Sequence, residues 1–271
     1  MPDTPTGFAA SGGAQLHYQT AGEGDTIFFI HAGVADSRMW QHQFTDLASN
    51  HHLVAYDTRG FGQSVFFDEP FSDHTDALAV MDHLEIGRAV VVACSMGCQT
   101  AINLALTAPE RVRALVLIGG WPPGFEASAE YEPPQWPELV KAFRAGDMET
   151  TADLEAEIWV VGHGRSKADV DPSVFLLVSE MSLIALPQEK ARDERVVALD
   201  PPAKDRLSEI AVPTLVMIGE YDLPDLQEAS VHMAGLFSQQ PAQVIPDAAH
   251  LPSLEQPVRF NQLLRDFLAT L

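Results

Sequence analysis

Residues 89–97 read AVVVACSMG. The first six are apolar or small, and a short uninterrupted run of this kind is typical of a strand covered on both faces of a sheet. Ser95 follows the run directly, and residues 96–108 have a helical pattern that stops before Pro109. A buried strand, a serine and a helix in immediate succession predict a tight turn with the serine at its apex.

The same alternation of apolar strands and helices continues on both sides of this stretch. The expected strands cover residues 15–21, 26–30, 52–56, 89–94, 114–118, 214–219 and 242–245. The expected helices cover residues 37–47, 72–84, 96–108 and 257–269. Strands that alternate with helices indicate βαβ units and a mainly parallel sheet, and therefore an α/β fold.

The alternation is interrupted in the middle of the chain, where no buried strand is expected. Proline-rich pieces separate helical patterns there, which cover residues 137–145, 151–161 and 172–186. We therefore expect residues 1–120 and 211–271 to form the α/β core. Residues 121–210 are expected to form a helical lid, or cap, inserted into that core.

Composition narrows the possible partners. The 271 residues include 16 Lys and Arg against 38 Asp and Glu, which gives a formal net charge of −22. Such a surface repels phosphate backbones, so we expect no nucleic-acid partner. The sequence contains no run of 18 apolar residues, so no membrane-spanning helix is expected. No secretory pattern is visible at the start. We therefore expect a cytoplasmic location.

The two cysteines predict neither a disulfide framework nor a metal site. Cys94 and Cys98 lie four residues apart and are expected to be buried thiols near a helix start. We expect no metal and no cofactor.

Ser95 is the candidate nucleophile. A serine at a strand-to-helix turn needs small residues two positions before and after it, where the two backbones nearly touch. Ala93 and Gly97 meet this requirement. The alternative is that Ser95 only caps the following helix.

A serine hydroxyl needs a base that is oriented by an acid. Asp222 follows the expected strand 214–219, and His250 follows the expected strand 242–245. The carboxyl ends of parallel strands share one edge of a sheet, so both residues are expected near Ser95. Asp225 is the rival acid, but its position before a helical run predicts an N-cap instead. The other histidines are expected to be structural or solvated.

Two backbone amides are expected to form an oxyanion hole. One belongs to Met96, directly after the nucleophile, and the other to the loop after the strand 26–30. Gly33 is the preferred donor in that loop, with Val34 as the alternative. His31 is expected to hold the loop by hydrogen bonds rather than to carry protons.

Large apolar side chains of the expected lid are candidates for a substrate pocket, with ordinary core as the alternative role that their composition favours. The principal candidates are Trp121, Phe125, Trp136, Trp159 and Met181, followed by Phe175 and Leu183. Arg144 and Arg165 are candidates for binding a substrate carboxylate, with solvated surface as the alternative role.

Together these features resemble the α/β-hydrolase family over essentially the whole chain. The segments DSRMW (residues 36–40) and DTRGFGQS (residues 57–64) are similar to those of 3-oxoadipate enol-lactonases and related small esterases. The resemblance implies a mostly parallel eight-stranded sheet flanked by helices, with an inserted helical lid. It also implies a cofactor-free serine hydrolase acting on a small ester or lactone.

Three function classes remain open on the sequence. The first is ester or lactone hydrolysis through an acyl-enzyme. The second is other chemistry on the same triad, either carbon–carbon bond hydrolysis or a perhydrolase (haloperoxidase-type) activity. The third is a non-enzymatic member that binds a small molecule. The oxyanion loop lacks the Gly-Pro-Gly element typical of carbon–carbon hydrolases. A serine nucleophile argues against haloalkane cleavage, which needs an aspartate.

Overall fold

The structure is a computed structural model that describes residues 4–128, 131–238 and 240–271. It contains an eight-stranded sheet with the strand order β1-β2-β4-β3-β5-β6-β7-β8. The strands are β1 (Thr6–Ser11), β2 (Ala14–Ala21), β3 (Thr26–Ile30), β4 (His52–Tyr56), β5 (Ala89–Cys94), β6 (Val112–Ile118), β7 (Thr214–Gly219) and β8 (Gln243–Ile245). β2 pairs antiparallel with β1 and β4, and the other neighbours are parallel. This sheet confirms the predicted α/β fold class.

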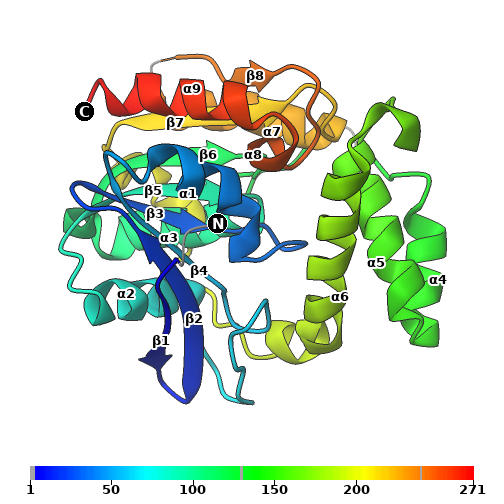
Figure 1. Cartoon of the computed structure of the whole chain (residues 1–271), viewed down its shortest axis with the longest axis horizontal. Coiled ribbons are helices and arrows are strands. Elements are labelled where there is room, and N and C mark those ends of the chain that lie inside the picture. Colours follow the sequence, from blue (N-terminus) through cyan, green and yellow to red (C-terminus); the bar gives the residue numbers. More distant parts are fainter. Residues whose placement is uncertain (1–3, 129–130, 239) are drawn as a thin grey trace.

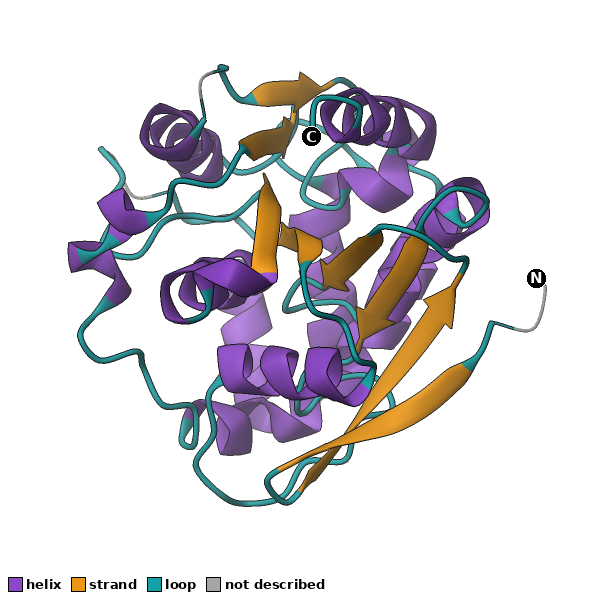
Figure 2. Cartoon of the chain, turned by 90° about the vertical axis from the view of Figure 1, so that its left-hand side faces the viewer, coloured by secondary structure: helices purple, strands orange, loops and turns teal. Residues whose placement is uncertain are grey.

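The apolar runs of the central strands supply both faces of the sheet. In β3, Ile27 and Phe29 belong to one buried cluster, whereas Phe28 and Ile30 belong to a second. Because successive side chains point to opposite faces, a strand between two helix layers must be apolar at every position. Figure 2 shows helices on both sides of the twisted sheet.

In the described residues, six α-helices come from the same parts of the sequence as the strands. They are α1 (Gln41–Leu47), α2 (Asp73–His83), α3 (Met96–Thr107), α7 (Pro224–Phe237), α8 (Pro252–Glu255) and α9 (Pro257–Leu268). Short 3₁₀ turns cover Ser37–Trp40, Pro109–Arg111, Lys167–Asp169, Ala203–Asp205 and Leu207–Glu209. α1 and α9 pack in the cluster that contains Ile27, and α2, α3 and α7 pack in the cluster that contains Phe28.

A separate group of helices lies at one side of the sheet (Figure 1). It consists of α4 (Trp136–Ala145), α5 (Met148–Ala156) and α6 (Pro172–Asp193), with a π-helical turn (Glu157–Val161) directly after α5. We call this group the α4–α6 layer. The helix expected over residues 151–161 is thus two elements, and the one expected over 172–186 continues through Pro187 to Asp193. The division of the chain into core and lid at residues 120 and 211 remains a prediction.

Within the described residues, no helix is both long enough and apolar enough to cross a membrane.

Candidate active site

Ser95 lies at the turn between β5 and α3 in a conformation that few residues adopt. Its φ of 52° and ψ of −117° fall in the left-handed half of backbone space, which costs a non-glycine residue on the order of 1–3 kcal/mol. The turn is held by Ser95 N–H, which donates to Ile118 O at 2.8 Å. A Cβ on Gly97 would lie 2.8 Å from the carbonyl oxygens of Ile30 and His31, so only glycine fits there. The close approach expected from the sequence is therefore present.

Asp222 and His250 form a buried pair beyond the ends of β7 and β8. His250 Nδ1 lies 2.9 Å from Asp222 Oδ2 and 3.1 Å from Oδ1, and their side chains are 2% and 1% exposed. Asp222 Oδ1 also accepts from Leu223 N–H at 2.8 Å, which fixes the carboxylate. The second ring nitrogen of His250 has no hydrogen-bond partner in the described part of the chain, so it is free to accept a proton.

Two adjacent glycines connect this pair with the serine. A Cβ on Gly119, which has a φ of +55°, would lie 3.0 Å from Asp222 Oδ2 and 3.2 Å from His250 Nδ1. A Cβ on Gly120 would lie 3.1 Å from Ser95 O. The end of β6 therefore contacts the Asp222–His250 pair with one residue and the serine turn with the next. The sequence analysis did not single out these two glycines.

Asp225 does not share this arrangement. It lies in the first turn of α7, and its Oδ1 accepts from Leu226 N–H at 3.0 Å. The expected N-cap position belongs to Leu223, because Pro224 occupies the first helical position, where its fixed φ suits a helix start. The prediction that Asp225 caps the helix is therefore wrong by two residues.

Gly33 and Met96, whose N–H groups are the expected oxyanion donors, lie next to each other. A Cβ on Gly33 would lie 3.7 Å from Cβ and Sδ of Met96. Met96 is the first residue of α3, so its N–H has no carbonyl to bond within the helix. Both residues line a cavity of about 130 Å³. Val34, the alternative donor, is buried in the core.

The His31 side chain links the loop that contains Gly33 to Thr58 by hydrogen bonds. Its Nε2 accepts from Thr58 N–H at 2.9 Å, so Nδ1 carries the proton and donates to Ala32 O at 2.8 Å. The ring is fully buried, and this burial lowers the pKa of His31. A neutral histidine with both nitrogens engaged is structural, as predicted.

Trp159 of the π-helical turn packs against His250. The two rings lie 4.4 Å apart between centroids, and Trp159 O accepts from His250 N–H at 3.1 Å. π-helical turns occur often at functional sites. Trp159 was predicted to line the substrate pocket, but it is absent from the lining of the cavity beside Gly33 and instead contacts the candidate base.

Arg165 has a role that the sequence analysis did not foresee. Both alternatives considered, a substrate carboxylate and solvated surface, are inconsistent with a side chain that is 7% exposed and paired with Glu255 at 2.8 Å. Glu255 is 5% exposed and accepts from Ala249 N–H and Leu251 N–H, the amides on either side of His250. Arg165 also donates to the carbonyls of the π-helical turn. The Arg165–Glu255 ion pair therefore connects the backbone on either side of His250 to the α4–α6 layer.

The remaining pocket candidates lie elsewhere. Trp121 and Trp136 are 47% and 42% exposed, and Met181 is fully buried in the core, where its sulfur accepts from Asp36 N–H at 3.4 Å. Phe125 packs on His232 with ring centroids 5.3 Å apart. None of these side chains lines the cavity beside Gly33 and Met96. Of the weaker candidates, Leu183 and Arg144 are exposed and Phe175 lies beside Lys167.

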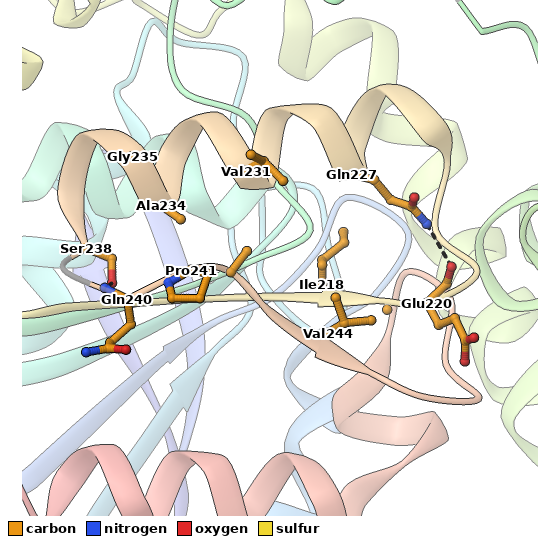
Figure 3. Close-up of a pocket in the computed structure, with 12 residues that line it drawn as sticks. Ile218, Glu220, Gln227, Val231, Ala234, Gly235, Ser238, Gln240, Pro241 and Val244 are labelled. Atoms are coloured by element: carbon orange, nitrogen blue, oxygen red, sulfur yellow. Dashed lines mark hydrogen bonds between the residues drawn. The ribbon is translucent and has the colours of Figure 1, made fainter.

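A larger cavity of about 630 Å³ lies between α7 and β8 (Figure 3). Its walls are largely apolar and include Ile218, Val231 and Val244, and at one end Gln227 Nε2 donates to Glu220 O at 2.7 Å. None of Ser95, Asp222 and His250 lines it. Cavity size therefore does not locate the candidate site.

Within the described residues, no group of three or more His, Cys, Asp or Glu side chains is arranged to hold a metal ion.

Comparison with known proteins places this geometry in a family. The sequence profile of the α/β hydrolase fold matches residues 25–257. The chain belongs to the α/β-hydrolase fold family. This confirms the resemblance to α/β hydrolases that the sequence analysis inferred.

Individual α/β hydrolases are similar over nearly their whole length. The chain is 27% identical over 254 residues to 3-oxoadipate enol-lactonase 1 of Acinetobacter baylyi, covering 90% of this chain and 89% of that one. It is 28% identical to a pimeloyl-[acyl-carrier protein] methyl ester esterase of Nitrosospira multiformis, covering 92% and 96%. Among solved structures, Est816, described as an N-acyl homoserine lactone degrading enzyme, superposes with a TM-score of 0.76 at 28% identity, covering 97% and 100%. These names agree with the expectation of an ester-bond hydrolase.

Proposed function

We propose that this α/β hydrolase cleaves a small ester or lactone through an acyl-enzyme on Ser95. One observation carries the proposal: a strained serine turn and a buried Asp–His pair meet at the adjacent glycines Gly119 and Gly120. A serine held at a backbone cost, next to an oriented imidazole, is the arrangement that acyl transfer requires. The lactonase and esterase names of the relatives support the substrate class.

The proposed reaction begins with proton transfer. His250 Nε2 accepts the proton of Ser95 Oγ while Oγ attacks the carbonyl carbon of the substrate. The carbonyl π electrons move to oxygen, and the N–H groups of Gly33 and Met96 stabilise the resulting oxyanion. Each donor of this kind is typically worth about 2.7–4 kcal/mol of barrier.

Collapse of the tetrahedral intermediate breaks the carbon–oxygen bond of the ester. The imidazolium of His250 gives its proton to the departing alkoxide, and the acyl group stays on Ser95. Water then attacks the acyl-enzyme with His250 again as base, which releases the acid and restores the serine. In a lactone the alkoxide remains tethered to the acyl chain, but the bonds that form and break are the same.

Asp222 has an orienting role in this scheme. Its carboxylate accepts from Nδ1–H of His250, which fixes the tautomer with Nε2 free to act as base. The same carboxylate stabilises the imidazolium that forms during each proton transfer. Because both side chains are almost fully buried, water does not compete for this hydrogen bond.

Hydrolysis of p-nitrophenyl acetate tests the proposal. We expect a burst of about one equivalent of p-nitrophenol per chain, then steady turnover, with Ser95→Ala showing neither. Turnover in Ser95→Ala equal to that of the wild type would overturn the assignment. Ester binding with no turnover in the wild type would favour the non-enzymatic class, and peroxide-dependent bromination that exceeds hydrolysis would favour the perhydrolase class.

A further inference from the structure

The cavity beside Gly33 and Met96 extends to the α4–α6 layer. Glu155 of α5 and Ser182 of α6 form part of its far wall. Its volume of about 130 Å³ is less than half of the ~300 Å³ at which pockets for drug-sized ligands begin. It can therefore hold a short chain but not a large group.

The proposed reaction decides which end of the substrate faces this cavity. The leaving oxygen must lie next to His250, which protonates it, and therefore on the side of Trp159. The cavity lining includes both proposed oxyanion donors but neither His250 nor Trp159. The acyl group, on the other side of the carbonyl carbon, is thus the part that enters the cavity.

Glu155 is an acidic group without a counter-charge in this wall. The Ser182 hydroxyl donates to its carboxylate. Among the described residues, no lysine, arginine or histidine forms an ion pair with it. Burial, with a smaller contribution from the charge of Glu189, raises the pKa of Glu155 to about 7. A cation placed in the cavity would supply the missing charge.

Arg192 also lines the cavity, but its charge is already compensated. Its Nη2 lies 2.8 and 2.7 Å from the two carboxylate oxygens of Asp73, and its Nη1 lies 3.8 Å from Asp193. Glu189 adds a further acidic group to the wall. Arg192 Nε has no hydrogen-bond partner among the described residues, but the two carboxylates beside its Nη atoms compensate its charge. The cavity lining therefore contains three acidic side chains, Glu155, Glu189 and Asp193, against one paired arginine.

We propose that this cavity is the acyl subsite and that Glu155 selects short acyl chains that end in a protonated amine. The inference rests on the proposed function, because it places the reacting carbonyl beside Gly33 and Met96. An ammonium group donates up to three hydrogen bonds, and charge-assisted hydrogen bonds to a carboxylate are the stronger kind. A chain that ends in a carboxylate would face like charges at the same wall.

Three ethyl esters separate these cases at pH 7.5: ethyl 3-aminopropanoate (cationic), ethyl butyrate (its neutral isostere) and monoethyl succinate (anionic). In the wild type, kcat/KM for the cationic ester should exceed that for the neutral ester about tenfold or more, the usual loss for one charged hydrogen bond. The anionic ester should be the slowest. A cationic-to-neutral ratio near or below one would overturn the proposal.

Two matched variants assign the effect to Glu155. In Glu155→Gln the cationic-to-neutral ratio should fall to about one. In Glu149→Gln, which changes an exposed glutamate of the same helix outside the cavity, the ratio should stay at the wild-type value. A ratio that is equally high in Glu155→Gln would remove Glu155 from the subsite.

Calorimetric binding to Ser95→Ala keeps this test independent of turnover. That variant should bind ethyl 3-aminopropanoate about tenfold or more tightly than ethyl butyrate, and adding Glu155→Gln should remove the difference. Equal binding of the two esters would overturn the subsite. Loss of Ser95-dependent hydrolysis with the binding difference intact would overturn only the proposed function.

Discussion

In the sheet and its flanking helices, which we call the core, the candidate nucleophile, acid and base each follow a strand by a few residues. In the α4–α6 layer, the side chains that contact the site come from a π-helical turn, a loop and two helix faces. Ser95 directly follows Cys94, the last residue of β5, whereas Arg165 reaches Glu255 across 90 positions of sequence. The core site is thus encoded locally, and the contribution of the layer depends on how distant segments pack.

This difference explains what could be predicted. The apolar runs of β3, β5, β6 and β7 need no knowledge of tertiary contacts, because a strand buried on both faces is apolar at every position. Strand ends then indicate which polar residues meet. The strand β1 was missed because its sequence, TGFAAS, is short of large apolar side chains and lies at the edge of the sheet.

The residues that escaped prediction share a different property. Glu155, Arg165 and Glu255 are charged side chains that become wholly or largely buried, and a charge gives no sign in the sequence that it will be paired or enclosed. The large aromatic residues of the same segment illustrate the converse. Trp121 and Trp136 are half-exposed in the structure, since apolar character alone does not say which surface a residue packs against.

The largest expected effect is in the core. Asp222→Asn should lower kcat about 10⁴-fold with little loss of stability, as for the comparable substitution in the serine-protease triad. The matched control is Asp225→Asn, which changes a first-turn helix residue worth about 0.3–1 kcal/mol and should leave kcat unchanged. Steady-state kinetics with thermal melting decides between them. The reverse result would make Asp225 the orienting acid.

The second largest effect is expected for a glycine beside the Asp222–His250 pair, and a glycine of the α4–α6 layer serves as its control. Gly119→Ala and Gly146→Ala both place a Cβ at positive φ, 55° and 75°, and each should cost about 1 kcal/mol of stability. Only the Cβ on Gly119 would contact Asp222 and His250, whereas that on Gly146 would meet nothing within 4 Å. Gly119→Ala should therefore lose about 10²-fold in kcat through misplacement of the pair.

Denaturant unfolding and kinetics of both glycine variants check this contrast. Equal activity losses in the two variants would mean that backbone strain, not contact with the Asp222–His250 pair, sets the cost.

A smaller effect is expected where the two regions meet. Glu255→Gln removes the charge that pairs with Arg165 and weakens its hold on the amides beside His250. Breaking a buried ion pair costs about 3–5 kcal/mol of stability. We expect kcat to fall about tenfold with KM nearly unchanged, because the base is displaced without loss of substrate contacts.

Glu209→Gln is the matched control, since it breaks the exposed Arg206–Glu209 pair, which is worth about 0–1 kcal/mol. If Glu255→Gln loses stability but keeps full kcat, the Arg165–Glu255 pair supports the fold and not the position of His250.

The smallest effect concerns how the free energy of unfolding depends on pH, and not kcat. The pKa of Glu155 is raised from 4.5 to about 7, so the folded state binds this proton more tightly than the unfolded chain. Its contribution to stability is present below pH 4.5 and is lost as pH rises through about 7, in total on the order of 3 kcal/mol. Relative to the wild type, Glu155→Gln should therefore gain stability by that order between pH 4.5 and 7.5.

Urea unfolding at several pH values measures this difference, with Glu149→Gln as the control that should follow the wild type. A difference between Glu155→Gln and the wild type that does not change with pH would show that burial does not raise the pKa of Glu155.

Labelling with a fluorophosphonate tests the central claim, that the core presents Ser95 as an activated nucleophile, most directly. Intact mass and peptide mapping should show one adduct per chain, located on Ser95, and none in Ser95→Ala. Labelling should slow by orders of magnitude in Asp222→Asn and stay at the wild-type rate in Asp225→Asn. An adduct on another serine, or equal labelling of Ser95→Ala, would contradict the account.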